Sequence, residues 1–105
     1  MTEYIVILTT VPDKETGRTL TEKLLEERLA ACVTQSAACD SSYWWEGKIT
    51  REQEYLLIIK TRSSLFSQLE NRIQALHPYD VPEIIALPVS EGSKKYLDWI
   101  QEETE

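Results

Sequence analysis

The 105-residue sequence predicts an α+β fold, in which a four-stranded antiparallel sheet carries two helices on one face and a short helix follows. Three observations indicate it. The runs at residues 4–8 and 54–61 are apolar through their middle and rich in β-branched side chains, as in central strands. Two further segments, residues 14–30 and 63–76, repeat apolar side chains at helical spacing. The complete order is β-α-β-β-α-β, which places both helices on one face of the sheet.

A helix, a strand and a hairpin follow the first strand. Asp13 is suited to cap the N-terminus of the helix at residues 14–30, whose leucines recur at helical spacing among charged side chains. Residues 31–35 predict the second strand. Gly47 then marks the turn of a hairpin that leads into the third strand.

The second half of the chain predicts a helix, a strand and a last helix. Ser63 or Ser64 is suited to cap the second helix. The proline-containing loop 77–82 ends that helix, because proline disfavours helical geometry in the residue before it. Residues 83–87 predict the fourth strand, and Gly92 precedes the C-terminal helix. Right-handed crossovers then give the strand order 4-1-3-2.

One face of this sheet has no helix to cover it. The first and third strands are apolar at consecutive positions, so both of their faces need cover. A bare apolar face larger than a few hundred Å² is unusual in a soluble monomer. We therefore expect self-association through the sheet, aided by a long hairpin that presents the adjacent rings of Tyr43, Trp44 and Trp45 near its tip.

Composition and charge limit the classes of protein. The net charge of −7 has the wrong sign for binding a phosphate backbone, so nucleic acid is not expected as a partner. Acidity favours either cation binding or, more simply, solubility. No apolar run reaches the ~18 residues of a membrane span, and the first five residues lack the features of a signal peptide. We expect one domain over residues 1–105, in the cytoplasm and without a membrane partner.

The two cysteines do not predict a disulfide. Cys32 and Cys39 are seven positions apart, so on one extended strand their Cα atoms would be roughly 23 Å apart. Cys32 lies in an apolar stretch, where packing as a small hydrophobe is favoured over binding Cu(I). Cys39 lies in a small, polar stretch and is expected to be more exposed.

Six segments, in order over essentially the whole chain, together have the pattern of one known family. They are residues 9–13 (TTVPD), 27–33 (ERLAACV), 43–49 (YWWEGKI), 60–61 (KT), 77–85 (HPYDVPEII) and 96–100 (YLDWI). With this spacing they resemble the CutA1 family of divalent-cation tolerance proteins. The resemblance implies a ferredoxin-like subunit in a tight homotrimer, a cytosolic location, and binding of copper or other divalent metals. In architecture the family is also similar to the trimeric PII signalling proteins.

The candidate metal ligands are His77, Asp80 and Glu83. His77 is the only histidine, and neutral imidazole is a good ligand for Cu²⁺ or Zn²⁺, to which the two carboxylates add oxygen ligands. Alternatively, the prolines of this loop serve only its shape. The resemblance implies metal sites that use a cysteine late in the first strand and a histidine doublet, but Thr9 and Leu76 occupy those positions. The departure predicts a weaker, less selective site, completed by a neighbouring subunit.

The aromatic cluster has two compatible interpretations. The rings of Tyr43, Trp44 and Trp45 dock against a neighbouring subunit, which we favour because aromatic anchors dominate interfaces, or they line a ligand cleft between subunits. The residues expected to supply polar contacts there are Glu46, Lys60 and Tyr79.

No catalytic constellation is evident. The sequence has no nucleophile with a positioned histidine partner, no phosphate-binding glycine loop and no paired-zinc spacing. We therefore predict a non-enzymatic homotrimer of CutA1 type that acts in divalent-cation tolerance, with a divalent metal, copper foremost, and no organic cofactor. The alternative is a PII-like structural or signalling trimer whose inter-subunit clefts bind a small molecule or a partner protein, with metal binding incidental.

Overall fold

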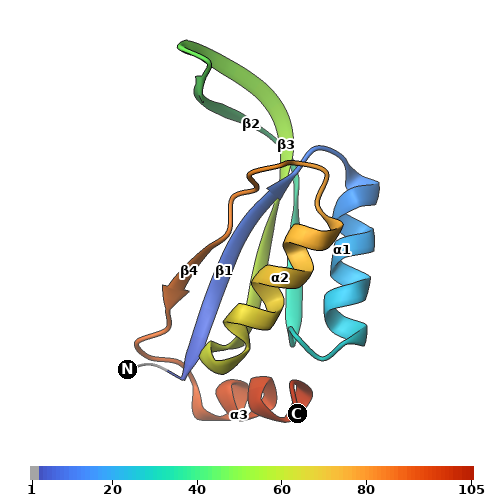
Figure 1. Ribbon diagram of the computed structural model, residues 1–105. Helices are drawn as coiled ribbons and strands as arrows, with labels where there is room; N and C mark the ends of the chain where they lie inside the picture. Colours follow the sequence, from blue (N-terminus) through green and yellow to red (C-terminus); the bar gives the residue numbers. More distant parts are fainter. Residues whose placement is uncertain (1–2) are drawn as a thin grey trace.

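The computed structural model describes residues 3–105 as an antiparallel sheet with helices packed on it (Figure 1). The elements are β1 (Tyr4–Val11), α1 (Lys14–Glu26), β2 (Cys32–Trp45), β3 (Lys48–Arg62), a 3₁₀ turn (Ser63–Leu65), α2 (Phe66–Leu76), β4 (Ile85–Pro88) and α3 (Lys94–Glu103). The strand order β2-β3-β1-β4 confirms the predicted order, read from the other edge. Met1 and Thr2, on which the expectation of no signal peptide partly rests, lie outside the described residues.

Helix α1 begins as predicted and ends earlier. The Asp13 side chain caps it by accepting a 2.8 Å hydrogen bond from the Thr16 backbone N–H. The helix ends at Glu26 rather than residue 30, because Arg28 adopts a φ of 60°. This left-handed conformation is unfavourable for a residue with a Cβ atom. The Arg28 guanidinium also lies 2.9 Å from the Glu103 carboxylate and so connects this turn to α3.

The hairpin of β2 and β3 is long, as predicted, but β2 continues to Trp45 where the sequence predicted a strand over residues 31–35 only. Its strands stay paired outward to Trp45 and Lys48, and its far half projects beyond the rest of the fold (Figure 1). Glu46 and Gly47 form the two-residue turn, with φ values of 50° and 76°. Such turns match the twist of the strands they connect. The sequence did not reveal the full length of β2, because residues 36–42 are small and polar and have low strand propensity.

The predicted cap of the second helix was wrong. Arg62 is the N-cap of the 3₁₀ turn and Leu65 is that of α2, so neither Ser63 nor Ser64 caps the helix. At α3 the cap is Ser93, whose hydroxyl oxygen accepts a 3.4 Å hydrogen bond from the Tyr96 N–H. Gly92 thus precedes the last helix, as predicted.

The hydrophobic core lies between the sheet and helices α1 and α2. Alternate side chains of β1 and β3 point into it, as the two-residue period of a strand requires. Its fully buried aliphatic members are Ile7, Val11, Leu20, Leu24, Leu57, Ile59, Leu69 and Ile73.

The opposite face of the sheet is apolar and incompletely covered in the single chain, as the sequence predicted. The register aligns Leu8 with Ile58 on one side and Ile85 on the other, so the three side chains share a face. Ile85 is 51% exposed and Leu87 is 49% exposed. We call this surface the open face; its members are Val6, Leu8, Leu56, Ile58, Ile85 and Leu87.

Helix α3 lies across the lower end of the sheet (Figure 1). The Arg62 guanidinium donates a 2.7 Å hydrogen bond to the Thr104 hydroxyl, just after the helix, and also bonds to the Thr104 carbonyl. The Lys60 ammonium lies 5.7 Å from the centroid of the Tyr96 ring. Within residues 3–105, no helix is both long enough and apolar enough to cross a membrane.

Candidate functional site

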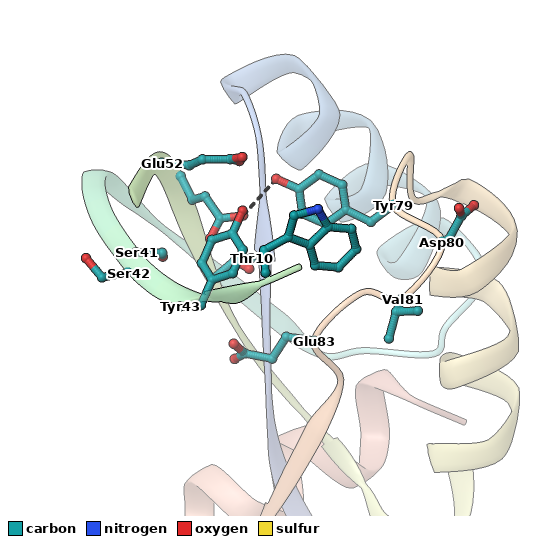
Figure 2. Close-up of a pocket in the computed structure, with 11 residues that line it drawn as sticks. Thr10, Ser41, Ser42, Tyr43, Glu52, Tyr79, Asp80, Val81 and Glu83 are labelled. Atoms are coloured by element: carbon teal, nitrogen blue, oxygen red, sulfur yellow. Dashed lines mark hydrogen bonds between the residues drawn. The ribbon is translucent and has the colours of Figure 1, made fainter. Parts of the chain in front are cut away.

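A cleft lies where the long hairpin leaves the sheet and the loop after α2 passes beside it. Its volume is about 670 Å³, within the usual range of small-molecule sites. Figure 2 shows side chains from both walls pointing into the space between them. The lining residues are Thr10, Ser41, Ser42, Tyr43, Trp45, Glu52, Glu54, Tyr79, Asp80, Val81 and Glu83.

His77 ties the loop to the end of β1. Its side chain is only 7% exposed. The Tyr79 backbone N–H donates a 3.1 Å hydrogen bond to Nδ1, so the neutral ring carries its proton on Nε2. That Nε2–H donates to the Thr10 carbonyl at 2.7 Å. Both ring nitrogens are therefore occupied by structural hydrogen bonds.

Tyr79 crosses the cleft to the hairpin. Its hydroxyl donates a 2.7 Å hydrogen bond to the Glu54 carboxylate, drawn as the dashed line in Figure 2. Burial, and then this hydrogen bond, raise the pKa of the Tyr79 hydroxyl. The phenol consequently remains a donor throughout the physiological range. Glu54 itself is only 5% exposed.

The hairpin contributes two aromatic rings to the cleft. Tyr43 and Trp45 are two positions apart on β2 and so lie on the same face of the strand. Trp44 lies on the other face, beside its register partner Ile49, and is 73% exposed. A hydrogen bond with Glu52 raises the pKa of Tyr43.

The cleft is strongly acidic. Among residues 3–105, four carboxylates line it, and no lysine, arginine or histidine does. None of the four forms an ion pair with a described residue. Their combined charge therefore gives the cleft a negative potential that attracts cations. The four are Glu52, Glu54, Asp80 and Glu83.

The structure brings some of the predicted metal ligands together. Asp80 and Glu83 both line the cleft, whereas His77 faces inward and does not. Among residues 3–105, no group of three or more His, Cys, Asp or Glu side chains is placed to hold a metal ion. Cys32 and Cys39 are free thiols, as predicted, and the Cys39 thiol lies 3.3 Å from the Glu54 carbonyl.

Only some of the predicted interface residues line the cleft. Tyr43, Trp45 and Tyr79 meet in the cleft, but Trp44 and Glu46 do not line it and Lys60 lies near α3. The polar lining comes instead from residues that the sequence analysis missed, Glu52 and Glu54 foremost. Glu52 and Glu54 are two positions apart, a spacing that places both side chains on one face of a strand. The predicted strand began at residue 54, so Glu52 was left outside it.

Comparison with known proteins gives consistent matches. Residues 5–103 match the family model described as CutA1 divalent ion tolerance protein. The chain is 50% identical over 99 residues to the divalent-cation tolerance protein CutA of Thermus thermophilus. The matched segment covers 94% of this chain and 96% of that protein. It is 50% identical over 100 residues to the chloroplastic protein CutA 1 of Oryza sativa subsp. japonica, covering 95% of this chain. The chain spans 56% of that longer relative.

Solved structures of similar proteins superpose on nearly the whole of this chain. The Thermus thermophilus divalent cation tolerance protein (Cut A1) superposes with a TM-score of 0.95 at 49% identity, covering 97% of this chain and 99% of that chain. The periplasmic divalent cation tolerance protein CutA of Archaeoglobus fulgidus gives a TM-score of 0.94 at 40% identity, with the same coverage.

Proposed function

The chain belongs to the CutA1 family of divalent ion tolerance proteins, and on this basis we propose that it binds divalent cations, copper foremost, as a cytoplasmic homotrimer. The observation that supports the proposal is the cleft, which the described residues line with four carboxylates and no cationic side chain. We propose that residues 1–105 act as one domain and without catalytic activity. Because the names of relatives include chloroplastic and periplasmic forms, the location needs its own test by cell fractionation.

The loop carboxylates are the proposed metal ligands. Asp80 and Glu83 are exposed, line the cleft and have no ion-pair partner among the described residues. Oxygen ligands suit hard divalent cations, and imidazole suits copper. We propose that His77 becomes the nitrogen ligand only when the metal displaces one of its two hydrogen bonds. Losing such a buried bond costs about 1–3 kcal/mol, so binding should be weak and unselective.

Titration calorimetry with Cu²⁺ tests this proposal. We expect one saturable site per subunit, abolished in Asp80→Asn/Glu83→Gln and weakened in His77→Ala. Glu22→Gln, an exposed carboxylate on α1 outside the cleft, is the matched control. Thermal unfolding of the same samples separates loss of a ligand from loss of the fold. Unchanged heats in both Asp80→Asn/Glu83→Gln and His77→Ala would show that scattered surface carboxylates bind the metal.

The open face supports the proposed trimer. Its aliphatic side chains form rows across three strands and remain only partly covered in the single chain. Contiguous apolar surface of this kind marks an interface in soluble proteins. The projecting hairpin adds exposed rings, with Trp44 at 73% and Trp45 at 59%. In such an assembly a neighbouring subunit would complete the coordination that Asp80 and Glu83 begin.

A further inference from the structure

Glu54 is an almost fully buried carboxylate without a cationic partner among the residues that the structure describes. It is 5% exposed, and Oε2 accepts the hydrogen bond from Tyr79. Oε1 accepts no hydrogen bond from the described residues, and no ion pair involves this side chain in the part of the chain that the structure describes. A buried charge is costly unless an opposite charge compensates it. Because Glu54 lines the cleft, a ligand that enters the cleft can supply that charge.

The lining also indicates what else the ligand carries. The rings of Tyr43, Trp45 and Tyr79 line the same cleft as the carboxylates. Aromatic faces attract organic cations, and burial of apolar ligand surface against them is favourable. A hydrated metal ion gains little from these rings, whereas a protonated amine with an apolar body matches both parts of the wall.

We propose that the cleft binds a small organic cation, with its ammonium group at Glu54 and Glu52 and its apolar part among the three rings. This activity goes beyond metal binding and does not depend on it. The amine site uses carboxylates of β3, whereas the proposed metal ligands belong to the loop after α2. A second copy of the chain that filled the cleft instead would exclude the amine.

The probe for this site is 2-phenylethylammonium, titrated at pH 7 with EDTA present so that no metal takes part. Its counterpart 3-phenylpropionate has the same ring and nearly the same length but the opposite charge. We expect saturable binding of the ammonium, followed by calorimetry and tryptophan fluorescence. The carboxylate should bind at least about tenfold more weakly, since it meets unpaired carboxylates in the cleft.

Two matched pairs of variants locate the site. Glu54→Gln keeps an acceptor for the Tyr79 hydroxyl but removes the charge, and we expect affinity to fall about tenfold or more. Glu22→Gln, outside the cleft, should leave affinity unchanged. Trp45→Ala should weaken binding, while Trp44→Ala, the neighbouring ring on the other strand face, should not.

Three results would overturn the proposal: no saturable binding to the wild type, equal binding of the two probes, or unchanged affinity in Glu54→Gln. If circular dichroism shows that Glu54→Gln does not fold, the exposed Glu52→Gln is measured in its place. Copper titrations on the same samples without EDTA are read separately. Failure of the metal proposal therefore leaves the amine result intact, and failure of the amine proposal leaves the metal result intact.

Discussion

The Tyr79 hydroxyl lies 2.7 Å from the Glu54 carboxylate, although the two residues are 25 positions apart in the chain. This hydrogen bond joins the loop after α2 to β3 at the point where the hairpin leaves the sheet. On the same loop, His77 is bonded to the Thr10 carbonyl at the end of β1. Two central strands thus hold one loop, and the distance between the two walls of the cleft depends on both bonds.

Removing the Tyr79 hydroxyl should destabilise the fold. Tyr79→Phe leaves the buried Glu54 carboxylate without its donor, so we expect the free energy of unfolding to fall by about 1–2 kcal/mol. Urea denaturation measures the change. Tyr55→Phe is the control, because the structure gives the Tyr55 hydroxyl no hydrogen bond among the described residues. Equal midpoints for both variants would show that the Tyr79–Glu54 bond is energetically neutral.

A charge on the open face should dissociate the proposed trimer. Ile58→Glu places a carboxylate in the row formed with Leu8 and Ile85, where packing of another subunit would bury it. We expect the wild type at three times the mass of one chain by light scattering, and the variant at the mass of a single chain. Gln74→Glu, on an exposed position of α2, should stay trimeric. A monomeric wild type at micromolar concentration would refute the assembly.

The hairpin rings should contribute to the same assembly. Replacing Trp44 and Trp45 together by alanine removes two largely exposed rings that are expected to dock on a neighbour. We expect dissociation at higher protein concentrations than for the wild type, measured by sedimentation equilibrium. An identical dissociation profile would show that neither ring contributes to the assembly.

The cap of α1 should make stability depend on acid pH. The hydrogen bond from the Thr16 backbone N–H lowers the pKa of Asp13 below its ordinary value of 3.8. The folded state therefore favours the charged carboxylate, and this stabilisation is present above about pH 4 and is lost as pH falls through the lowered pKa. Asp13→Asn keeps a capping side chain without titrating. Thermal midpoints from pH 2 to 7 should show a gap between wild type and variant that closes in acid; a constant gap would contradict this.

Local sequence predicted those features that depend on local chemistry. Asp13 caps α1 because a carboxylate at this position can accept a hydrogen bond from a free backbone N–H in the first turn of the helix. Gly47 lies in the hairpin turn, where a positive φ is required. The full length of β2 was missed, since the small polar residues 36–42 pair only because β3 lies beside them. The serine cap was wrong because a 3₁₀ turn intervenes before α2.

The amino-acid sequence by itself determined the order of strands and helices, the uncovered apolar face and the family, because these follow from periodicity and from motifs read along the chain. Only the tertiary structure decided which side chains share the cleft. It turned His77 inward onto two hydrogen bonds and brought Tyr79 to Glu54. The physical reason is that the two walls belong to distant segments, whose register and approach depend on packing across the sheet rather than on any local pattern.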